Sequence, residues 1–326
     1  MRRFFDNILF YVLYGLWRSW SLLPMWFHYA MADVLYVIVA HVLRYRHKVI
    51  DKNLALAFPE LDDAERRRIK HKFYHYFCDY LAETVKFTTM SLDNLKRRMV
   101  FHGDDMVRDI LKDGQDVAFM LGHYGNWEWM TCYPICFEGI DAQFGHVIHL
   151  LENPVMNRLM GAVRNHVGSQ NVGMKETLRW LMQNRKEGRP TILAYVSDQV
   201  PKWQNIHYWL EFMHQDTPVF TGTERIARRL NQAVVYVDVQ RVRRGYYVAE
   251  AQLITRDPNS LPEHAITDEF FRRLATTIRR APQYWLWSHN RWKRSREEFE
   301  QRFEVVNGRV IERVKDARND APRTHV

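Results

Sequence analysis

The stretch Asp116–Trp129, which reads DVAFMLGHYGNWEW, sets both the fold and the chemistry of this chain. Its first six residues form a short apolar run between a Gly-Gln turn and Gly122, which predicts a strand buried inside a sheet. His123 follows this strand directly, and Glu128 comes five positions later. Ligands of α/β proteins bind beyond the carboxyl ends of the strands, so His123 lies where a catalytic side chain is expected.

The two glycines of this stretch suit a catalytic turn. Gly122 and Gly125 let the chain turn sharply and let a substrate approach the backbone. If a helix begins near Gly125, Glu128 lies in its first turn and can face His123. A carboxylate fixes the tautomer of an imidazole, whose other nitrogen then takes a proton from a hydroxyl. The spacing alone leaves open whether His123 is catalytic or structural, because the chain holds 15 His.

Strand and helix patterns alternate along the chain, which predicts an α/β fold with a mixed, mostly parallel sheet flanked by helices. A hairpin expected across Arg243-Arg244-Gly245 makes the sheet mixed. Further strands are expected at Gln143–Leu150, Pro190–Val196, Gln232–Arg241 and Tyr246–Ile254. Helices are expected at Asp63–Thr89 (with Asp62 as N-cap), Asn126–Phe137, Pro154–His166, Lys175–Lys186, Thr223–Asn231 and Asp268–Arg280. The charged tail beyond Arg291 is predicted to be helical and to fray at Asn319–Val326.

The composition combines a basic charge with many aromatic residues. The 326 residues carry 47 Lys and Arg against 38 Asp and Glu, a net charge of +9, and 14% of them are aromatic. This apolar and aromatic content excludes a disordered chain, and a mean hydropathy of −0.43 argues against a protein with many membrane spans. The charge is +4 over residues 1–50, +7 over residues 271–326 and −2 between them. The composition as a whole fits either nucleic acid or an anionic membrane surface as a partner, but basic ends around a nearly neutral centre suit anionic lipid headgroups and not nucleic acid.

Residues 1–50 are the most apolar part of the chain. Arg18 and Pro24 interrupt the first apolar run and Asp33 lies in the second, so neither is a clean membrane span. We expect one or two helices that lie in the membrane interface or dip into the bilayer. The alternative is an amphipathic hairpin packed on the rest of the protein. The chain is therefore divided into membrane-associated helices, residues 1–45, and an α/β domain with a basic helical tail, residues 46–326.

The cysteines give no sign of a disulfide framework or a metal site. The chain has three cysteines, Cys78, Cys132 and Cys136. An odd and small number in a chain of this length does not make a disulfide framework. No second Cys or His pair follows Cys132 and Cys136 at zinc spacing. Buried thiols in a reducing compartment are the expectation.

The segment GHYGNWEW resembles the His-x4-acid motif of membrane glycerolipid and lipid A acyltransferases, in the form typical of the late lipid A acyltransferases (lauroyl and myristoyl transferases). Other blocks resemble this family in the same order, over roughly residues 10–295. They are Arg44–Leu61 with Asn53-Leu54 and Phe58-Pro59, Asn153-Pro154 with Arg164 and Gly168, Asp198-Gln199, Phe212–Ala227, and Trp285–Lys293. Several ordered blocks are far more specific than one motif.

The resemblance implies a fold like that of glycerol-phosphate acyltransferases and acyl transfer in lipopolysaccharide biosynthesis. The donor would be an acyl thioester, of acyl-carrier protein or coenzyme A, and the acceptor a hydroxyl of a lipid A precursor. His123 would deprotonate the hydroxyl and Glu128 would orient His123, with no covalent intermediate, metal or further cofactor. The implied location is the cytoplasmic face of the bacterial inner membrane.

The resemblance also implies a set of substrate-binding residues: Asn126, Asn153, Arg164, Asp198 and Gln199. Arg164 would hold the oxyanion, together with backbone amides near Gly125, or would bind a substrate phosphate. Asp198 would pair with Arg164 or contact the sugar. Trp127, Trp129, Met130 and the N-terminal helices would line an acyl channel.

The chain departs from the family pattern at Val200-Pro201-Lys202 after Asp-Gln, at Met213-His214 after Phe212, and at His149. These departures leave the acyl length and the acceptor open. A lysophospholipid or other lipid O-acyltransferase is the nearest alternative. A basic nucleic-acid-binding protein and an inactive scaffold are the others, although no recognised nucleic-acid-binding motif occurs in the sequence.

Overall fold

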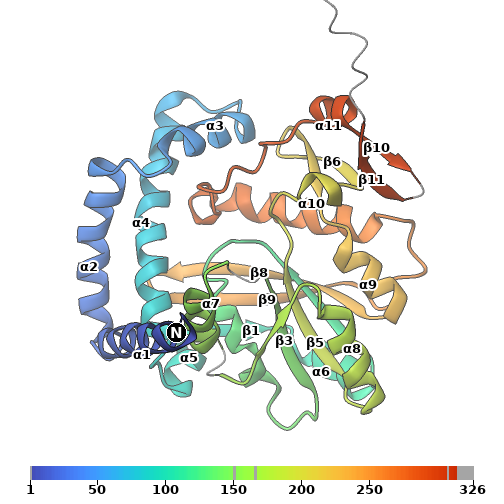
Figure 1. Ribbon diagram of the computed structural model, residues 1–326, viewed down its shortest axis with the longest axis horizontal. Coiled ribbons are helices and arrows are strands. Elements are labelled where there is room, and N and C mark those ends of the chain that lie inside the picture. Colours follow the sequence, from blue (N-terminus) through green and yellow to red (C-terminus); the bar gives the residue numbers. More distant parts are fainter. Residues whose placement is uncertain (1, 150–151, 165–166, 307, 314–326) are drawn as a thin grey trace, which may run out of the picture.

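A sheet with helices around it forms the centre of the protein (Figure 1). Its seven strands follow the order β1-β9-β8-β2-β5-β3-β4. The computed structural model describes residues 2–149, 152–164, 167–306 and 308–313. All neighbouring strands are parallel except β8 and β9, which form the antiparallel hairpin expected from the sequence. The strands are β1 (Met99–His102), β2 (Val117–Leu121), β3 (Gln143–Ile148), β4 (Gln170–Gly173), β5 (Thr191–Val196), β8 (Ala233–Arg243) and β9 (Tyr246–Thr255). The predicted mixed, mostly parallel α/β sheet is confirmed.

Strand β2 lies between β8 and β5 and is buried on both faces. Val117, Phe119 and Leu121 face one apolar core, while Ala118 and Met120 face the other. Side chains of a strand alternate between the two faces of a sheet, so a strand covered on both sides reads as a continuous apolar run. This is why DVAFML could be recognised as a buried strand.

Helices cover both faces of the sheet. They are α3 (His47–Ala57), α4 (Asp63–Phe87), α5 (Leu92–Arg98), α6 (Asp104–Lys112), α7 (Pro154–Arg164), α8 (Thr177–Lys186), α9 (Gly222–Leu230), α10 (Ala265–Arg280) and α11 (Arg296–Arg302). Short 3-10 helices are η2 (Trp129–Phe137), η4 (Trp203–Asn205) and η5 (Pro282–Tyr284). Buried residues of α6 and η2 pack in the core of Val117, and those of α9 and α10 pack in the core of Ala118.

Helix α4 begins where the sequence predicts. The Asp62 side chain accepts the backbone N–H of Glu65, and the Glu65 side chain accepts the N–H of Asp62, which completes a capping box. The helix then runs to Phe87 and buries a face of aromatic and acidic residues. Helix α2 packs alongside it (Figure 1).

The N-terminal segment is a pair of helices packed on α4. Helix α1 (Arg2–Ser21) and helix α2 (Met25–Val37) meet at the turn before Pro24, and α2 continues as a π-helix, η1 (Ile38–Val42). Trp17 Nε1 donates to Thr88 Oγ1 over 2.8 Å, and Lys86 Nζ donates to the carbonyls of Ser21 and Leu23. The stretch Met25–Val42 is long and apolar enough to cross a membrane by length and composition, and little of it is buried.

Several elements differ from the sequence expectation. Strands β1 and β4 and the hairpin of β6 (Tyr208–Phe212) and β7 (Gln215–Val219) were not expected; each has only four or five residues. The helix expected over Asn126–Phe137 is a 3-10 helix that begins at Trp129 and contains Pro134. The described part of the tail, which was expected to be helical, holds the seven-residue α11 and then the hairpin of β10 (Phe303–Val306) and β11 (Arg309–Glu312). Leu150, His166 and Asn319–Val326 lie outside the described residues.

The turn after His123 should tolerate no side chain at Gly125. Gly125 has φ +59°, and a Cβ there would lie 2.8 Å from Val239 Cγ1. Gly139 has φ +84° but open space around it, so it is the matched control. Gly125→Ala should lower the free energy of unfolding by about 2–4 kcal/mol and Gly139→Ala by about 1 kcal/mol, measured by denaturant titration. Equal losses would show that only the backbone angle matters.

Candidate active site

The site forms where β2 and β5 end side by side. Leu121 and Val196 are register partners in these parallel strands, and the Ser197 N–H donates to the Leu121 carbonyl over 3.1 Å. The two strands therefore end at the same level, on the same side of the sheet. His123 and Asp198 each lie two residues past the end of their strand, so the topology brings them together.

Asp198 holds the imidazole of His123. Its Oδ1 is 2.5 Å from His123 Nδ1, and its Oδ2 accepts the backbone N–H of His123 over 2.9 Å. Trp285 Nε1 donates to the same Oδ2 over 2.7 Å. Asp198 is 2% exposed, and burial alone would raise its pKa, but the charge and hydrogen bonds of His123 and the bond from Trp285 lower the pKa to about 2. The carboxylate stays ionised and holds the proton of His123 on Nδ1.

The other nitrogen of His123 faces Gln199. The Gln199 side-chain amide lies 3.1 Å from His123 Nε2 and donates to its lone pair. With Nδ1–H bound to Asp198, Nε2 is the nitrogen that can accept a proton. The side chain of His123 is 17% exposed, so Nε2 is set for proton transfer at a partly open surface.

Glu128 contacts Arg164 and not His123. Its two oxygens accept from Arg164 Nε over 2.7 Å and from Arg164 Nη2 over 2.6 Å. Burial alone would lower the pKa of Arg164, but its bonds to Glu128 raise it, so the guanidinium is cationic. Residues Asn126–Glu128 form a turn instead of the expected helix, so Glu128 is not carried back toward His123. Asp198 therefore orients the imidazole of His123, the role that the sequence analysis gave to Glu128. The expected pair of Asp198 with Arg164 does not form, because Arg164 binds Glu128.

The two asparagines predicted to bind substrate contact protein groups. Asn126 is fully buried, donates to Glu83 Oε2 over 2.7 Å and accepts the N–H of Trp129 over 3.0 Å. Asn153 Oδ1 accepts the N–H groups of Val155 and Met156, as an N-cap of α7 does. Asn153 therefore fixes the start of the helix that ends at Arg164, while Asn126 fixes the turn after His123.

The C-terminal block closes the site from behind. Trp285, Trp287 and Trp292 are buried, as core packing predicts. Asn53 Nδ2 donates to the carbonyls of Trp287 and His289, so two distant blocks of the sequence meet here. Burial lowers the pKa of His289 to about 4, and its neutral Nε2 accepts the N–H of Val200. The Leu286 N–H also donates to the His123 carbonyl over 3.1 Å.

The sequence reasoning missed the role of Trp285 as a partner of Asp198. Trp127, which was expected to line an acyl channel, makes contacts that were not expected: its ring lies edge-on to His123 with centroids 5.3 Å apart and stacks on Tyr80 at 4.1 Å. The amide of Gly125, expected to bind an oxyanion, donates instead to the Tyr284 carbonyl over 3.0 Å. The signal that could have found Trp285 is its position in the tryptophan-rich block that the family resemblance had already marked.

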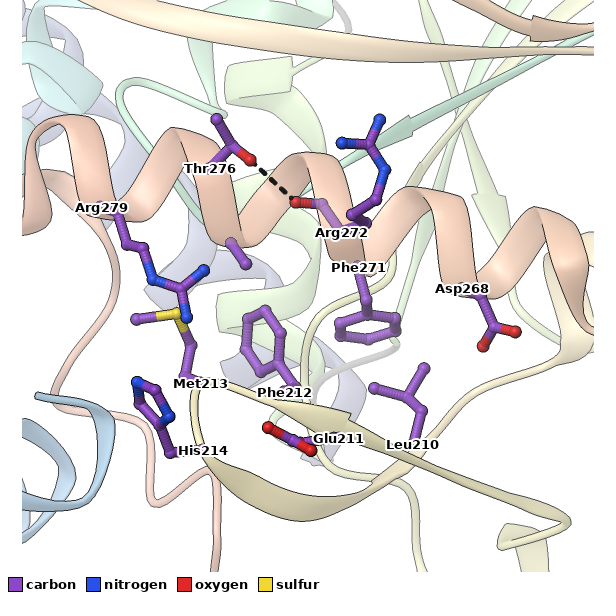
Figure 2. A pocket seen from close by; sticks show the side chains of 11 residues that line it. Leu210, Glu211, Phe212, Met213, His214, Asp268, Phe271, Arg272, Thr276 and Arg279 are labelled. Atoms are coloured by element: carbon purple, nitrogen blue, oxygen red, sulfur yellow. Dashed lines mark hydrogen bonds between the residues drawn. The ribbon is translucent and has the colours of Figure 1, made fainter.

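Two cavities lie near the site without including His123. One, of about 410 Å³, lies between the β6–β7 hairpin and α10, with Phe212 and Phe271 facing it and Arg272 and Arg279 on α10 (Figure 2). Phe212 separates it from Trp285, whose ring is 5.9 Å away. The other, of about 680 Å³, lies where α1 meets α7 and the end of β3, and is lined by residues that include Phe10, Ile148 and Trp180.

Comparison with known proteins identifies the class of this protein as an acyltransferase. Residues 2–294 match the family described as bacterial lipid A biosynthesis acyltransferase. The chain belongs to that family.

Two curated relatives are lipid A biosynthesis myristoyltransferase of Escherichia coli (strain K12) and lipid A biosynthesis acyltransferase 1 of Shigella flexneri. Each is 20% identical to this chain over 137 residues, which cover 42% of this chain. The match spans 41% of the length of each relative.

The hydrogen bonds of Asp198 should make the free energy of unfolding depend on pH in the acid range. The folded pKa of Asp198, about 2, lies below its ordinary 3.8, so its contribution is present above pH 3.8 and is lost as the pH falls through about 2. The difference in unfolding free energy between the natural protein and Asp198→Asn should therefore shrink by about 1 kcal/mol between pH 6 and pH 3. Denaturant titrations at both pH values measure it. A difference independent of pH would contradict the bonded carboxylate.

Proposed function

We propose that this protein transfers a fatty acyl group from an acyl thioester, carried by acyl-carrier protein, to a hydroxyl of a lipid A precursor. The observation that carries the proposal is the His123 Nε2 lone pair beside a partly open surface, held in place through Asp198. Membership of the acyltransferase family supports the reaction class. The names of the two relatives support the lipid substrate.

The reaction begins when the acceptor hydroxyl replaces the Gln199 amide at His123 Nε2. Nε2 takes the hydroxyl proton, and Asp198 stabilises the imidazolium that forms. The oxygen attacks the thioester carbonyl carbon, and the C–S bond breaks as the tetrahedral intermediate collapses. The leaving thiolate takes the proton from Nε2, which restores the site and needs no acyl-enzyme.

The negative charge on the carbonyl oxygen needs fixed donors. Arg164 is the charged candidate, because its bidentate bond to Glu128 fixes its guanidinium plane and holds it cationic. Arg164 serves the oxyanion or a phosphate of the acceptor, and both tasks suit a fixed guanidinium. Glu128 is then a positioning residue for Arg164. In the His-x4-acid motif, the histidine would transfer the proton and the acid would hold the arginine.

The 680 Å³ cavity suits an acyl chain. It extends between α1 and α7, so it joins the N-terminal helices to the helix that ends at Arg164. Phe10, Ile148, Val172 and Trp180 supply apolar walls. Trp129 and Met130, expected in the channel, are instead buried in the core.

The outer faces of α1 and α2 suit a membrane surface. More than half of the large apolar residues exposed on the described part of the chain lie between Phe4 and Leu43, and Trp26 is 70% exposed. Exposed Arg18, Arg44 and Lys48 flank them. An apolar face with basic flanks binds an anionic bilayer. This supports a location at the cytoplasmic face of the bacterial inner membrane.

Activity tests the reaction and the substrate together. Purified protein is incubated with acyl-acyl-carrier protein and either a lipid A precursor or a lysophospholipid, and products are identified by mass spectrometry. We expect acylation of the lipid A precursor. Product from the lysophospholipid alone would favour the other lipid O-acyltransferase, and no product from either would contradict the proposal.

The residues of the base should be indispensable. His123→Ala and Asp198→Asn should lower kcat about 10²–10⁴-fold, because a positioned base contributes that much. His102→Ala, at an exposed position on the edge strand β1, is the control and should keep full activity. Full activity of His123→Ala would refute its assignment as the base.

Membrane binding should depend on the outer face of the N-terminal helices. The double variant Leu22→Ser with Trp26→Ser removes side chains that are 66% and 70% exposed, and should weaken partition into anionic vesicles at least tenfold. Val305→Ser with Val306→Ser, exposed on β10, is the matched control and should bind like the natural protein. Sedimentation with vesicles measures both. Equal weakening would show that no particular face docks.

A further inference from the structure

A carboxylate that the proposed reaction does not use lies at the centre of the protein. Glu83 on α4 is 0% exposed, yet it accepts hydrogen bonds from three other segments. Tyr29 on α2 donates to Oε1 over 2.9 Å, while Asn126 and Tyr247 each donate to Oε2 over 2.7 Å. Helix α2, the turn after β2 and strand β9 therefore share one buried carboxyl group.

One face of α4 holds the catalytic turn. Tyr76, Tyr80 and Glu83 lie at helical spacing on this face. Tyr76 donates to the carbonyl of Gly125, the ring of Tyr80 stacks on Trp127, and Glu83 accepts from Asn126. These three contacts are made to Gly125, Asn126 and Trp127, which are consecutive residues of the turn after His123. The position of α4 therefore sets the position of the turn.

The other side of Glu83 is reached by the membrane-facing helix. Tyr29 points its hydroxyl at Glu83, while Trp26 on the same helix is 70% exposed. A second link lies farther along α2, where Arg244 contacts both Asp33 and Asp79 over 2.6 Å. The same helix thus presents one face to the surroundings and one hydroxyl to the buried carboxylate.

The chain of bonds is direct. From the hydroxyl of Tyr29 to the amide of Asn126 there is one carboxylate, with 2.9 Å on one side and 2.7 Å on the other. Asn126 then closes the turn by accepting the N–H of Trp129. Without the Tyr29 hydroxyl, Oε1 keeps, within the described residues, only the guanidinium of Arg241, 4.0 Å away, and an unsatisfied buried carboxylate oxygen is costly, so we expect the carboxylate to shift toward its remaining partners. Loss of the Tyr29 bond is therefore transmitted to Asn126.

We propose that Tyr29, Glu83 and Asn126 form a positioning chain that couples the docking of α2 at the membrane to the placement of His123. The inference rests on the proposed function, because it concerns the rate of the reaction that His123 promotes. It means that the N-terminal helices are part of the catalytic apparatus as well as an attachment to the membrane.

The test uses the full-length chain in lipid vesicles and the variant Tyr29→Phe, which keeps the ring and removes the hydroxyl. Tyr36→Phe is the matched control on the same helix, because the Tyr36 hydroxyl contacts His71 and His41, each over 3.4 Å, away from Glu83. Tyr29→Phe should lower kcat about tenfold, leave KM for both substrates within twofold and sediment with vesicles normally. Tyr36→Phe should match the natural protein in all three.

A merely structural role gives a different pattern. If the hydroxyl only stabilises the fold, Tyr29→Phe melts at a lower temperature but keeps its kcat at temperatures where circular dichroism shows it folded, and this would overturn the proposal. Equal losses of kcat in Tyr29→Phe and Tyr36→Phe would also overturn it.

A second variant approaches the same carboxylate from the opposite side. Tyr247→Phe removes a donor from β9 and should lower kcat with unchanged KM in vesicles and in detergent alike. The loss in Tyr29→Phe should be largest in vesicles, where α2 is docked, and an identical loss in both media would overturn the coupling. Failure of the proposed function shows differently, as an inactive natural protein.

Discussion

The site depends on the carboxylate of Asp198, which is almost entirely buried. Asp198 satisfies its lone pairs with the ring and the backbone amide of His123 and with the indole of Trp285. These donors come from the end of β2 and from the C-terminal block, while Asp198 itself follows β5. A buried carboxylate loses several kcal/mol of hydration unless it is fully hydrogen-bonded, so the three segments must meet in one arrangement. The hydrogen bonds that Asp198 needs thus hold the three segments together, and the same bonds fix the tautomer of His123.

The buried strand β2 and the place of His123 at its end could be predicted because they follow from local patterns. A continuous apolar run, a glycine turn and a histidine at a strand end are all read within fourteen residues. The partner of His123 could not be found this way, since Asp198 lies 75 positions along the chain and becomes its neighbour only through the parallel pairing of β2 with β5. Sequence spacing favoured Glu128, which is nearer in the chain, but the turn at Asn126–Glu128 aims Glu128 toward α7 and Arg164. The short strands β1, β4, β6 and β7 were missed for a related reason, because four or five residues carry too little periodicity.

The distribution of charge also gains a structural meaning. Within the described residues, several arginines of the α/β part form ion pairs with buried acidic side chains. Examples are Arg164 with Glu128, Arg241 with Asp79 and Arg280 with Asp238. The basic residues beside the N-terminal helices are exposed next to apolar side chains. The net charge of the chain alone does not distinguish these two uses of arginine, which only the burial and the contacts of each side chain separate.

The amide of Gln199 at His123 Nε2 has a consequence for water. At rest the lone pair of the base is already occupied by a donor attached to the protein. A water molecule gains little by replacing that donor, because it brings one hydrogen bond and no other contact. A lipid hydroxyl brings the binding energy of its whole molecule, which is enough to move the amide aside. For the proposed reaction, the resting site thus guards the thioester from wasteful hydrolysis until an acceptor large enough to open it has arrived.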